Sequence, residues 1–270
     1  MIKLTFIPQT ELEKATLEAQ CEAMGALWTE ESGNSLMAFF DALPEGHPFG
    51  EPQIETVNPT DWKTVWGKHF ESFDWVEGWQ VCSIGTAVSA PKTLLIDAAD
   101  AFGDGKHPTT TLCAAALIGV LEGRNSLSNF GLLDVGTGTG ILSILGWKLG
   151  VKNPVGLDCD AEAIERALQN AKANGWHTPD FRCQLLADVP EEVLFDAIVA
   201  NINSAILEPL LPEISQRLKP GGVAILSGVG LQWADAFVQK IGEAGLGVMD
   251  QTASEGWLCF KTTRLSDLQN

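Results

Sequence analysis

The sequence of 270 residues lacks any apolar run that approaches the roughly 18 residues of a membrane-spanning helix. Its N-terminus, which begins Met1-Ile2-Lys3-Leu4, also lacks the charged and then apolar layout of a signal peptide. Repeats and low-complexity tracts are absent from the sequence as well. We therefore expect a cytoplasmic globular protein that makes no contact with a membrane.

Basic residues are scarce. The chain carries 17 lysines and arginines against 35 acidic residues, which gives a formal net charge of −18. Such a charge repels a phosphate backbone, so direct binding of nucleic acid is not expected. It would attract a basic protein partner, or it serves only to keep the protein in solution. We expect the protein to be a monomer.

Paired cysteines are missing too, because none of the six cysteines belongs to a C-x-x-C motif. Scattered cysteines of this kind favour free thiols in a reducing compartment, and a zinc site or another metal site is not expected. Hydrophobic residues make up 45% of the chain, which is ample for a sizeable core. The length suits one large domain with a small one beside it.

What the chain does contain is a strand, a glycine loop, a helix and a second strand in direct succession. The apolar run that ends in Asp134 has the composition of a strand buried on both faces of a parallel sheet. Gly136, Gly138 and Gly140 then let the backbone turn and come close to a ligand. Asp158 ends the next strand, where a carboxylate can accept hydrogen bonds from both ribose hydroxyls. This unit predicts a nucleoside site.

Two kinds of nucleoside ligand compete for this site. A dinucleotide motif, G-x-G-x-x-G, needs its third glycine at the position of Ile141. The pattern present is D-x-G-x-G-x-G, which resembles motif I of the class I methyltransferases that bind S-adenosyl-L-methionine. That ligand has no pyrophosphate, so the helix N-terminus need not hold a phosphate. We favour it over a nicotinamide or flavin cofactor and over a glycine loop that binds nothing.

Periodicity along the chain predicts three parts. Residues 1 to 58 follow a β-α-β-β-β pattern, which predicts a small α+β domain. Residues 59 to 100 form a structured connector, in which Thr60 caps a helix over residues 61 to 70. Residues 101 to 270 alternate strands and helices and end in an antiparallel hairpin. We therefore predict an α/β fold, with a doubly wound, Rossmann-like, seven-stranded sheet in the last part.

Turn and cap signals set the expected boundaries of several elements in the last part. They predict a helix over residues 112 to 121 and a strand over residues 181 to 186. A helix over residues 206 to 218 is expected to be interrupted at its two prolines, Pro209 and Pro212. A turn at Lys219-Pro220-Gly221-Gly222 then leads into a strand over residues 223 to 226.

A loop with two glycines, a proline and three threonines precedes the helix expected at residue 112. In a doubly wound sheet, the helix before the first strand starts beside the glycine loop, at the carboxyl ends of the strands. Thr109 and Thr110 would therefore present donors to a ligand at the positive end of a helix. The alternative is an ordinary helix start, with a threonine as N-cap and His107 as a turn residue.

Polar residues also follow two later strands of the sheet. Asn201 suits an amine acceptor, because its carbonyl oxygen accepts a hydrogen bond without carrying a full charge. Asn203 is expected to cap the helix that follows. Asp188 lies at the carboxyl end of another strand, where it either reads an adenine edge or caps the next turn.

The loop F-G-x-G-x-H-P-T-T, from Phe102 to Thr110, is the most specific motif of the chain. Together with the glycine motif, Gly156-Leu157-Asp158, Val199-Ala200-Asn201-Ile202 and Asp61-Trp62 with Trp66, it resembles the PrmA family of methyltransferases. The resemblance runs from about residue 55 to the end. It implies transfer of methyl from S-adenosyl-L-methionine to lysine ε-amino or N-terminal α-amino groups of a large-subunit ribosomal protein. The first 58 residues would recognise that substrate.

The resemblance also implies roles for single residues. Donor contacts would fall on Thr110, Gly136, Asp158 and Asn201, with Asn201 near the transferred methyl as the candidate catalytic residue. The remaining candidate donor-binding residues are Phe102, Thr109, Asp134, Gly138 and Asp188. Asp104 and Lys106 depart from the small or hydroxylated residues of the family. Another protein or a small amine is therefore an alternative acceptor, and a non-catalytic binding module is a third hypothesis.

Overall fold

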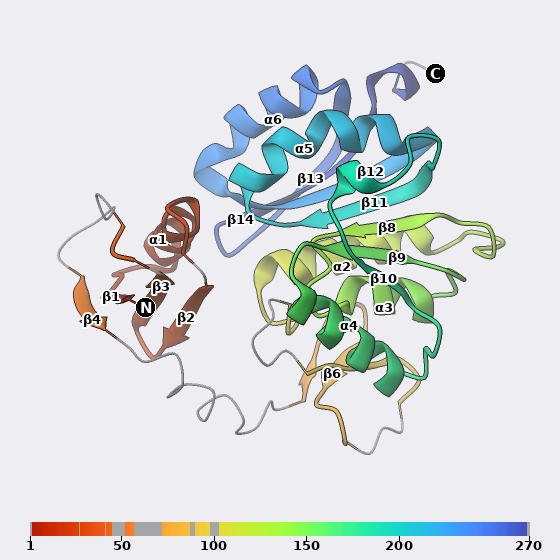
Figure 1. Ribbon diagram of the computed structural model, residues 1–270. Helices are drawn as coiled ribbons and strands as arrows, with labels where there is room; N and C mark the ends of the chain where they lie inside the picture. The colour runs from red at the N-terminus through yellow and green to blue at the C-terminus, as the bar shows by residue number, and fades with distance from the viewer. Residues whose placement is uncertain are drawn as a thin grey trace.

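The computed structural model describes residues 2–26, 28–40, 42–44, 52–56, 72–86, 90–97 and 103–268. Within these ranges the chain forms a four-stranded, a three-stranded and a seven-stranded sheet (Figure 1). The helix expected over residues 61 to 70, its cap Thr60 and the candidate site residue Phe102 lie outside the described residues. No helix in the described part of the chain is long and apolar enough to cross a membrane.

The N-terminal unit is a four-stranded antiparallel sheet in the order β2-β3-β1-β4, packed against one helix. Its elements follow the predicted β-α-β-β-β order: β1 (Ile2–Phe6), α1 (Glu11–Ala23), β2 (Trp28–Ser32), β3 (Ser35–Phe40) and β4 (Gln53–Thr56). Alternate residues of β1 and β3, such as Leu4 and Leu36, point towards Leu17 and Cys21 of α1 and form a separate small core.

A three-stranded sheet follows: β5 (Phe73–Asp74), β6 (Gln80–Cys82) and β7 (Thr93–Leu95). The two-residue β5 is too short to show a pattern in the sequence. Val81 and Leu94 are fully buried in the same core as the first helices of the main sheet. The described part of the connector is therefore packed onto the main domain.

The main sheet has the strand order β10-β9-β8-β11-β12-β14-β13, and its last strand pair is antiparallel. The strands are β8 (Leu132–Val135), β9 (Val155–Asp158), β10 (Asp180–Cys183), β11 (Phe195–Asn201), β12 (Leu218–Gly230), β13 (Leu246–Ser254) and β14 (Trp257–Arg264). Strand order reverses between β8 and β11, which is where ligands bind in such sheets. The predicted doubly wound, seven-stranded, Rossmann-like sheet with a terminal hairpin is confirmed.

Helices cover both faces of this sheet (Figure 1). One core contains side chains of α2 (Pro108–Leu121), α3 (Ile141–Lys148) and α4 (Ala161–Ala173). The opposite core contains α5 (Ser204–Arg217) and α6 (Ala234–Glu243). Neighbouring strand residues such as Leu132 and Leu133 belong to different cores, because successive side chains of a strand point to opposite faces.

Helix α2 begins at Pro108, earlier than the start predicted at Leu112. Proline suits the first helical position, because the N–H that it lacks would have no partner there. The cap is His107, whose Nδ1 accepts a hydrogen bond from the Thr109 amide at 3.3 Å. The alternative of an ordinary helix start with a threonine cap is therefore wrong, and Thr109 and Thr110 lie inside the first turn.

Three further boundaries differ from the predictions. The strand expected over residues 181 to 186 ends at Cys183, because the chain turns into a 3-10 helix at Leu186–Asp188. Helix α5 runs through Pro209 and Pro212 without interruption; both prolines are exposed, so the carbonyls left without partners face solvent. The turn expected at residues 219 to 222 is an irregularity within the longer strand β12.

Gly228 allows β12 to pass close to the end of β11. Its φ is +90°, and a Cβ there would lie 2.0 Å from the Ile202 carbonyl oxygen. We predict that Gly228→Ala lowers the free energy of unfolding by about 2 kcal/mol or more, since both backbone strain and a backbone clash result.

Gly242 in α6 is the matched control, because it has ordinary helical geometry and no atom within 4 Å of a built Cβ. Gly242→Ala should be neutral or stabilising by up to about 0.8 kcal/mol. Urea denaturation of both variants measures these differences, and equal stability of the two would contradict the prediction.

Candidate functional site

The glycine loop between β8 and α3 is shaped by three residues in the left-handed region. Gly136, Gly138 and Gly140 have φ values of +71°, +52° and +79°. A Cβ on Gly136 would lie 2.2 Å from Cγ2 of Ile202, so only glycine fits the close approach of loop and strand end. The amides of Gly136 and Thr137 both donate to the Leu157 carbonyl at 2.8 Å, which ties the loop to β9.

The buried carboxylate of Asp134 fixes the conformation of the glycine loop through hydrogen bonds. Its Oδ2 accepts hydrogen bonds from Thr137 Oγ1 at 2.7 Å, from Ser143 Oγ at 2.8 Å and from the Ser143 amide at 3.2 Å. Burial raises the pKa of the Asp134 carboxyl to about 6; the three hydrogen bonds oppose this rise, and the charge of Asp158 adds to it. The carboxyl is thus mainly ionised at neutral pH, although its pKa lies closer to that pH than the ordinary pKa of an aspartate does.

Asp158 closes the other side of the loop. Its Oδ2 accepts from the Gly138 amide at 2.9 Å and its Oδ1 from the Asp160 amide at 3.0 Å. Each of these oxygens retains acceptor capacity, since a carboxylate oxygen can accept more than one hydrogen bond. The predicted contact with a ribose is compatible with this arrangement and stays a prediction.

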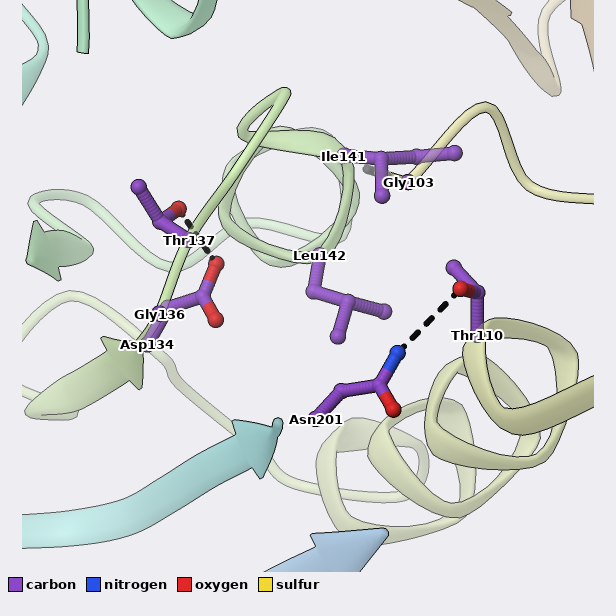
Figure 2. A pocket seen from close by; sticks show the side chains of 8 residues that line it. All are labelled: Gly103, Thr110, Asp134, Gly136, Thr137, Ile141, Leu142 and Asn201. Carbon is purple, nitrogen blue, oxygen red and sulfur yellow. Dashed lines mark hydrogen bonds between the residues drawn. The ribbon is translucent and has the colours of Figure 1, made fainter. Parts of the chain in front are cut away.

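Two polar residues from distant parts of the chain meet in the pocket beside the glycine loop. Asn201 at the end of β11 donates through Nδ2 to Oγ1 of Thr110, in the first turn of α2, at 3.2 Å (Figure 2). Their exposed fractions are 8% and 1%. Oδ1 of Asn201 is buried and accepts no hydrogen bond from any described residue. A buried acceptor of this kind is unfavourable unless a ligand supplies the donor.

The site residues predicted from sequence fall into two groups. Thr110, Asp134, Gly136 and Asn201 line one pocket. Four further lining residues were not predicted from the sequence, and these are Gly103, Thr137, Ile141 and Leu142 (Figure 2). Gly103 and Thr137 lie inside the two motifs, and Ile141 and Leu142 directly follow the glycine motif, so their place in or beside the motifs was the signal that could have identified them.

Other candidates lie outside this pocket. Gly138 is in the glycine loop, where its amide holds Asp158. Asp188 accepts from the Leu185 amide at 3.0 Å and so caps the turn after β10, as one of its two predicted roles required. The Thr109 hydroxyl contacts His107 Nδ1 at 2.7 Å.

The two residues that depart from the motif do not line the pocket either. Oδ1 of Asp104 accepts from the Lys106 amide at 2.9 Å, which closes the loop on itself. The Lys106 ammonium lies 5.8 Å from the centroid of the Phe73 ring, within range of a cation–π interaction. The departures therefore change the outer side of the loop rather than the pocket wall.

His107 connects the start of α2 to the N-terminal unit. Its Nε2 lies 3.7 Å from Oε1 of Glu18 in α1, and its ring packs edge-on against Trp257 with centroids 5.1 Å apart. Thr29 donates to the same carboxylate at 2.5 Å. One histidine therefore contacts the N-terminal unit, the terminal hairpin and the first turn of α2.

The charge of Glu18 is maintained at this contact. Burial acts to raise the pKa of the Glu18 carboxyl, but hydrogen bonds from His107, Thr29 and Trp257 and the charge of His107 outweigh it and hold the pKa below its ordinary value of 4.5. Stability from a lowered carboxyl pKa is present above the unfolded pKa and is lost as the pH falls through the folded pKa. The Glu18 carboxyl is therefore ionised at neutral pH.

Comparison with protein families gives a match over nearly the whole chain. The model described as Ribosomal protein L11 methyltransferase (PrmA) matches residues 4–265. A relative of that name from Pseudomonas paraeruginosa is 33% identical over 249 residues, which cover 90% of this chain and 81% of the relative. Another from Aeromonas salmonicida is 35% identical over 219 residues, covering 79% and 71%.

A solved structure shows the same arrangement. The crystal structure of a ribosomal protein L11 methylase from Lactobacillus delbrueckii subsp. bulgaricus aligns with a TM-score of 0.63 and 28% sequence identity. The alignment covers 72% of this chain and 99% of the other. The fold and the family assignment therefore agree.

The raised pKa of Asp134 predicts a pH dependence of stability. The unfolded carboxyl, with an ordinary pKa of 3.8, ionises at lower pH than the folded one, whose pKa is about 6. The associated stability is present below pH 3.8 and is lost as the pH rises through 6. Between pH 4 and pH 7 the wild type should lose on the order of 3 kcal/mol relative to Asp134→Asn.

Asparagine can still offer one oxygen to the three donors, so the variant is expected to fold. Chemical denaturation at several pH values measures the difference. Asp160→Asn, at the exposed cap of α4, is the control and should follow the wild-type profile. Parallel profiles of Asp134→Asn and the wild type would contradict the prediction.

Proposed function

The chain belongs to the PrmA family of ribosomal protein L11 methyltransferases, and on this basis we propose that it transfers methyl from S-adenosyl-L-methionine to amino groups of ribosomal protein L11. The acceptors are lysine ε-amino groups, the N-terminal α-amino group, or both. The observation that carries this function is the buried Oδ1 of Asn201, which accepts no hydrogen bond from the described residues and lies in the pocket beside the glycine loop.

The pocket residues fit such a donor. When bound, S-adenosyl-L-methionine supplies a methyl group on a positively charged sulfur. The Asp134 carboxylate gives the pocket a negative charge, and the glycine loop leaves the backbone open to close approach. The proposed donor contacts are Thr110, Gly136, Asp158, Asn201, Phe102, Thr109, Asp134, Gly138 and Asp188.

Asn201 is proposed to align the acceptor. Its Oδ1 can accept a hydrogen bond from an amine N–H and so direct the nitrogen lone pair at the methyl carbon. Thr110 fixes the other end of the amide, which keeps Oδ1 directed at the pocket. The nitrogen–carbon bond forms as the carbon–sulfur bond breaks, and the amine proton is lost to water.

The amine must be neutral before it attacks. A lysine has a reference pKa near 10.4, and a desolvated pocket lowers it. Among the described residues that line the pocket, Asp134 is the one carboxyl group, and its Oδ2 already accepts three hydrogen bonds. We therefore assign Asp134 to the charge of the pocket and to the shape of the loop rather than to proton removal.

The division of labour along the chain is part of the proposal. Residues 1 to 58 recognise the substrate, and residues 101 to 270 bind the donor and catalyse the methyl transfer. Residues 59 to 100 connect these two domains. The contact between Glu18 and His107 supports this scheme, since it joins the N-terminal unit to the helix that carries Thr110. The net charge of −18 favours a basic ribosomal protein in the cytoplasm and disfavours direct contact with nucleic acid. The protein is proposed to act as a monomer.

The direct test is incubation of the purified protein with ribosomal proteins and isotopically labelled donor, read by mass spectrometry. Label on L11 amines supports the proposal. Label confined to another protein or to a small amine would favour the alternative acceptors, which were considered because Asp104 and Lys106 depart from the family motif. Donor binding without any labelled product would favour a non-catalytic binding module.

Asn201→Ala should separate turnover from donor binding. The expected result is a fall in kcat of about 100-fold or more, because alignment of the reacting atoms is lost, with a donor Kd within a few fold of the wild type. Steady-state kinetics and calorimetry measure the two quantities. Equal losses in both would refute the alignment role.

Asn203→Ala is the matched control, two residues further along the chain. Asn203 caps α5 through a hydrogen bond from the Ala205 amide at 2.9 Å. Its removal should lower stability by about 1 kcal/mol and leave kcat nearly unchanged.

A further inference from the structure

Two asparagines of α4 and its C-terminal cap hold the outer edge of β7. Oδ1 of Asn174 accepts from the Leu95 amide at 3.0 Å, and its Nδ2 donates to the Leu95 carbonyl at 2.7 Å. Asn170 makes the same pair of contacts with Asp97, at 2.9 Å and 3.1 Å. Four helix residues advance roughly 6 Å and two strand residues roughly 6.7 Å, so the two amides match alternate residues of the chain.

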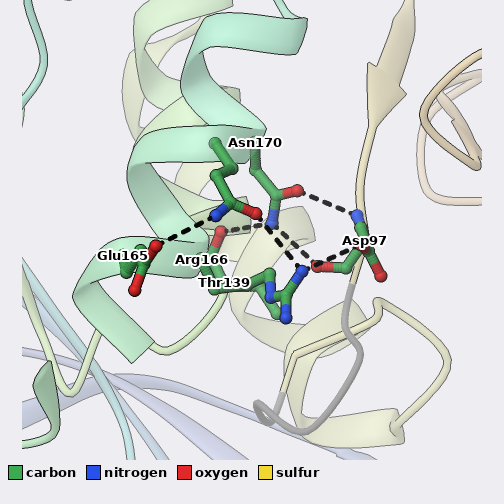
Figure 3. Close-up of polar contacts among 6 residues, drawn as sticks. Asp97, Thr139, Glu165, Arg166 and Asn170 are labelled. Atoms are coloured by element: carbon green, nitrogen blue, oxygen red, sulfur yellow. Dashed lines mark hydrogen bonds and ion pairs between the residues drawn. The ribbon is translucent and has the colours of Figure 1, made fainter. Parts of the chain in front are cut away.

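Asn170 makes one contact that Asn174 does not. Its Nδ2 also donates to the carbonyl of Thr139, in the glycine loop, at 2.9 Å (Figure 3). Thr139 in turn donates through Oγ1 to the carbonyl of Gly103, which lines the pocket, at 2.6 Å. Thr139 is therefore linked to Asp97 through the Asn170 side chain and to Gly103 directly. These two residues flank residues 98 to 102 in the sequence.

The geometry of this junction requires an amide at position 170. Both N–H groups of Nδ2 face carbonyl oxygens, while Oδ1 faces an N–H, so a flipped amide or a carboxylate would set oxygen against oxygen. Asn170 and Thr139 are both fully buried, with exposed fractions of 0%. The Arg166 guanidinium adds a contact to the Asp97 carboxylate at 2.9 Å at the partly exposed rim of this network (Figure 3).

We propose that Asn170 is a positioning residue for donor binding. It holds Asp97 against Thr139 and thereby fixes Gly103 of the F-G-x-G-x-H-P-T-T loop at the wall of the pocket. The assignment of the ligand rests on the function proposed above. The mechanical part, that Asn170 sets the position of this loop, does not depend on the identity of the ligand.

The test compares Asn170→Asp with Asn174→Asp in the full-length protein. Each change replaces an amide that donates two hydrogen bonds by a carboxylate of the same shape, but only the first touches Thr139. Calorimetric titration with S-adenosyl-L-methionine should show a Kd about tenfold weaker for Asn170→Asp and within twofold of the wild type for Asn174→Asp. At saturating donor, kcat of both variants should stay within twofold of the wild type.

Amide hydrogen exchange without ligand gives an independent readout. Residues 103 to 107 should exchange faster in Asn170→Asp than in Asn174→Asp when the two variants are compared at equal distance below their Tm. Equal exchange and equal Kd in the two variants would overturn the proposal. If the wild type itself does not bind S-adenosyl-L-methionine, the proposed function fails, and the exchange comparison still decides the positioning role.

A milder pair of substitutions provides the same comparison if the buried carboxylate of Asn170→Asp prevents folding. Asn170→Ser and Asn174→Ser leave small hydroxyl side chains and room for water at each site. The donor Kd should again weaken only for the change at position 170, by a smaller factor. A change in Tm for both variants with no difference in Kd between them would assign Asn170 to stability alone.

Discussion

The site depends on one buried carboxylate oxygen. Oδ2 of Asp134 accepts from Thr137 and twice from Ser143, and so joins the end of β8, the glycine loop and the first turn of α3. The loop that this oxygen shapes then supplies the groups that the neighbouring segments need. Gly138 donates to Asp158, and Thr139 accepts from Asn170 and donates to Gly103. The contacts that the loop makes with Asp158, Asn170 and Gly103 therefore depend on the loop conformation that Asp134 stabilises.

The electrostatics of the pocket follow from the same oxygen. Burial makes the negative charge of Asp134 unfavourable, as its raised pKa shows, and a cation bound nearby would relieve that penalty. A sulfonium donor carries such a charge, whereas its demethylated product does not.

The sequence predicted the sheet, the glycine loop and half of the residues that line the pocket, because periodic apolar patterns and local motifs carry that information. It did not predict contacts between segments far apart in the chain. Asn170 lies between Gln169 and Ala171 in α4, and asparagine is usually exposed, so its residue type does not distinguish it from a surface residue. Glu18 is comparable, since its burial depends on His107 and Trp257. The start of α2 was misplaced because its N-cap is His107, and histidine is not among the residues that usually occupy this position.

The N-terminal unit rests on the last strands of the chain. A Cβ on Gly256, in the turn between β13 and β14, would lie 2.3 Å from Cβ of Ala15 in α1, and Trp257 packs against His107. During synthesis the unit can fold soon after it leaves the ribosome, because its core is its own. The hairpin against which it docks is translated much later. A nascent chain arrested before residue 257 would therefore carry the N-terminal unit without the hairpin against which it packs.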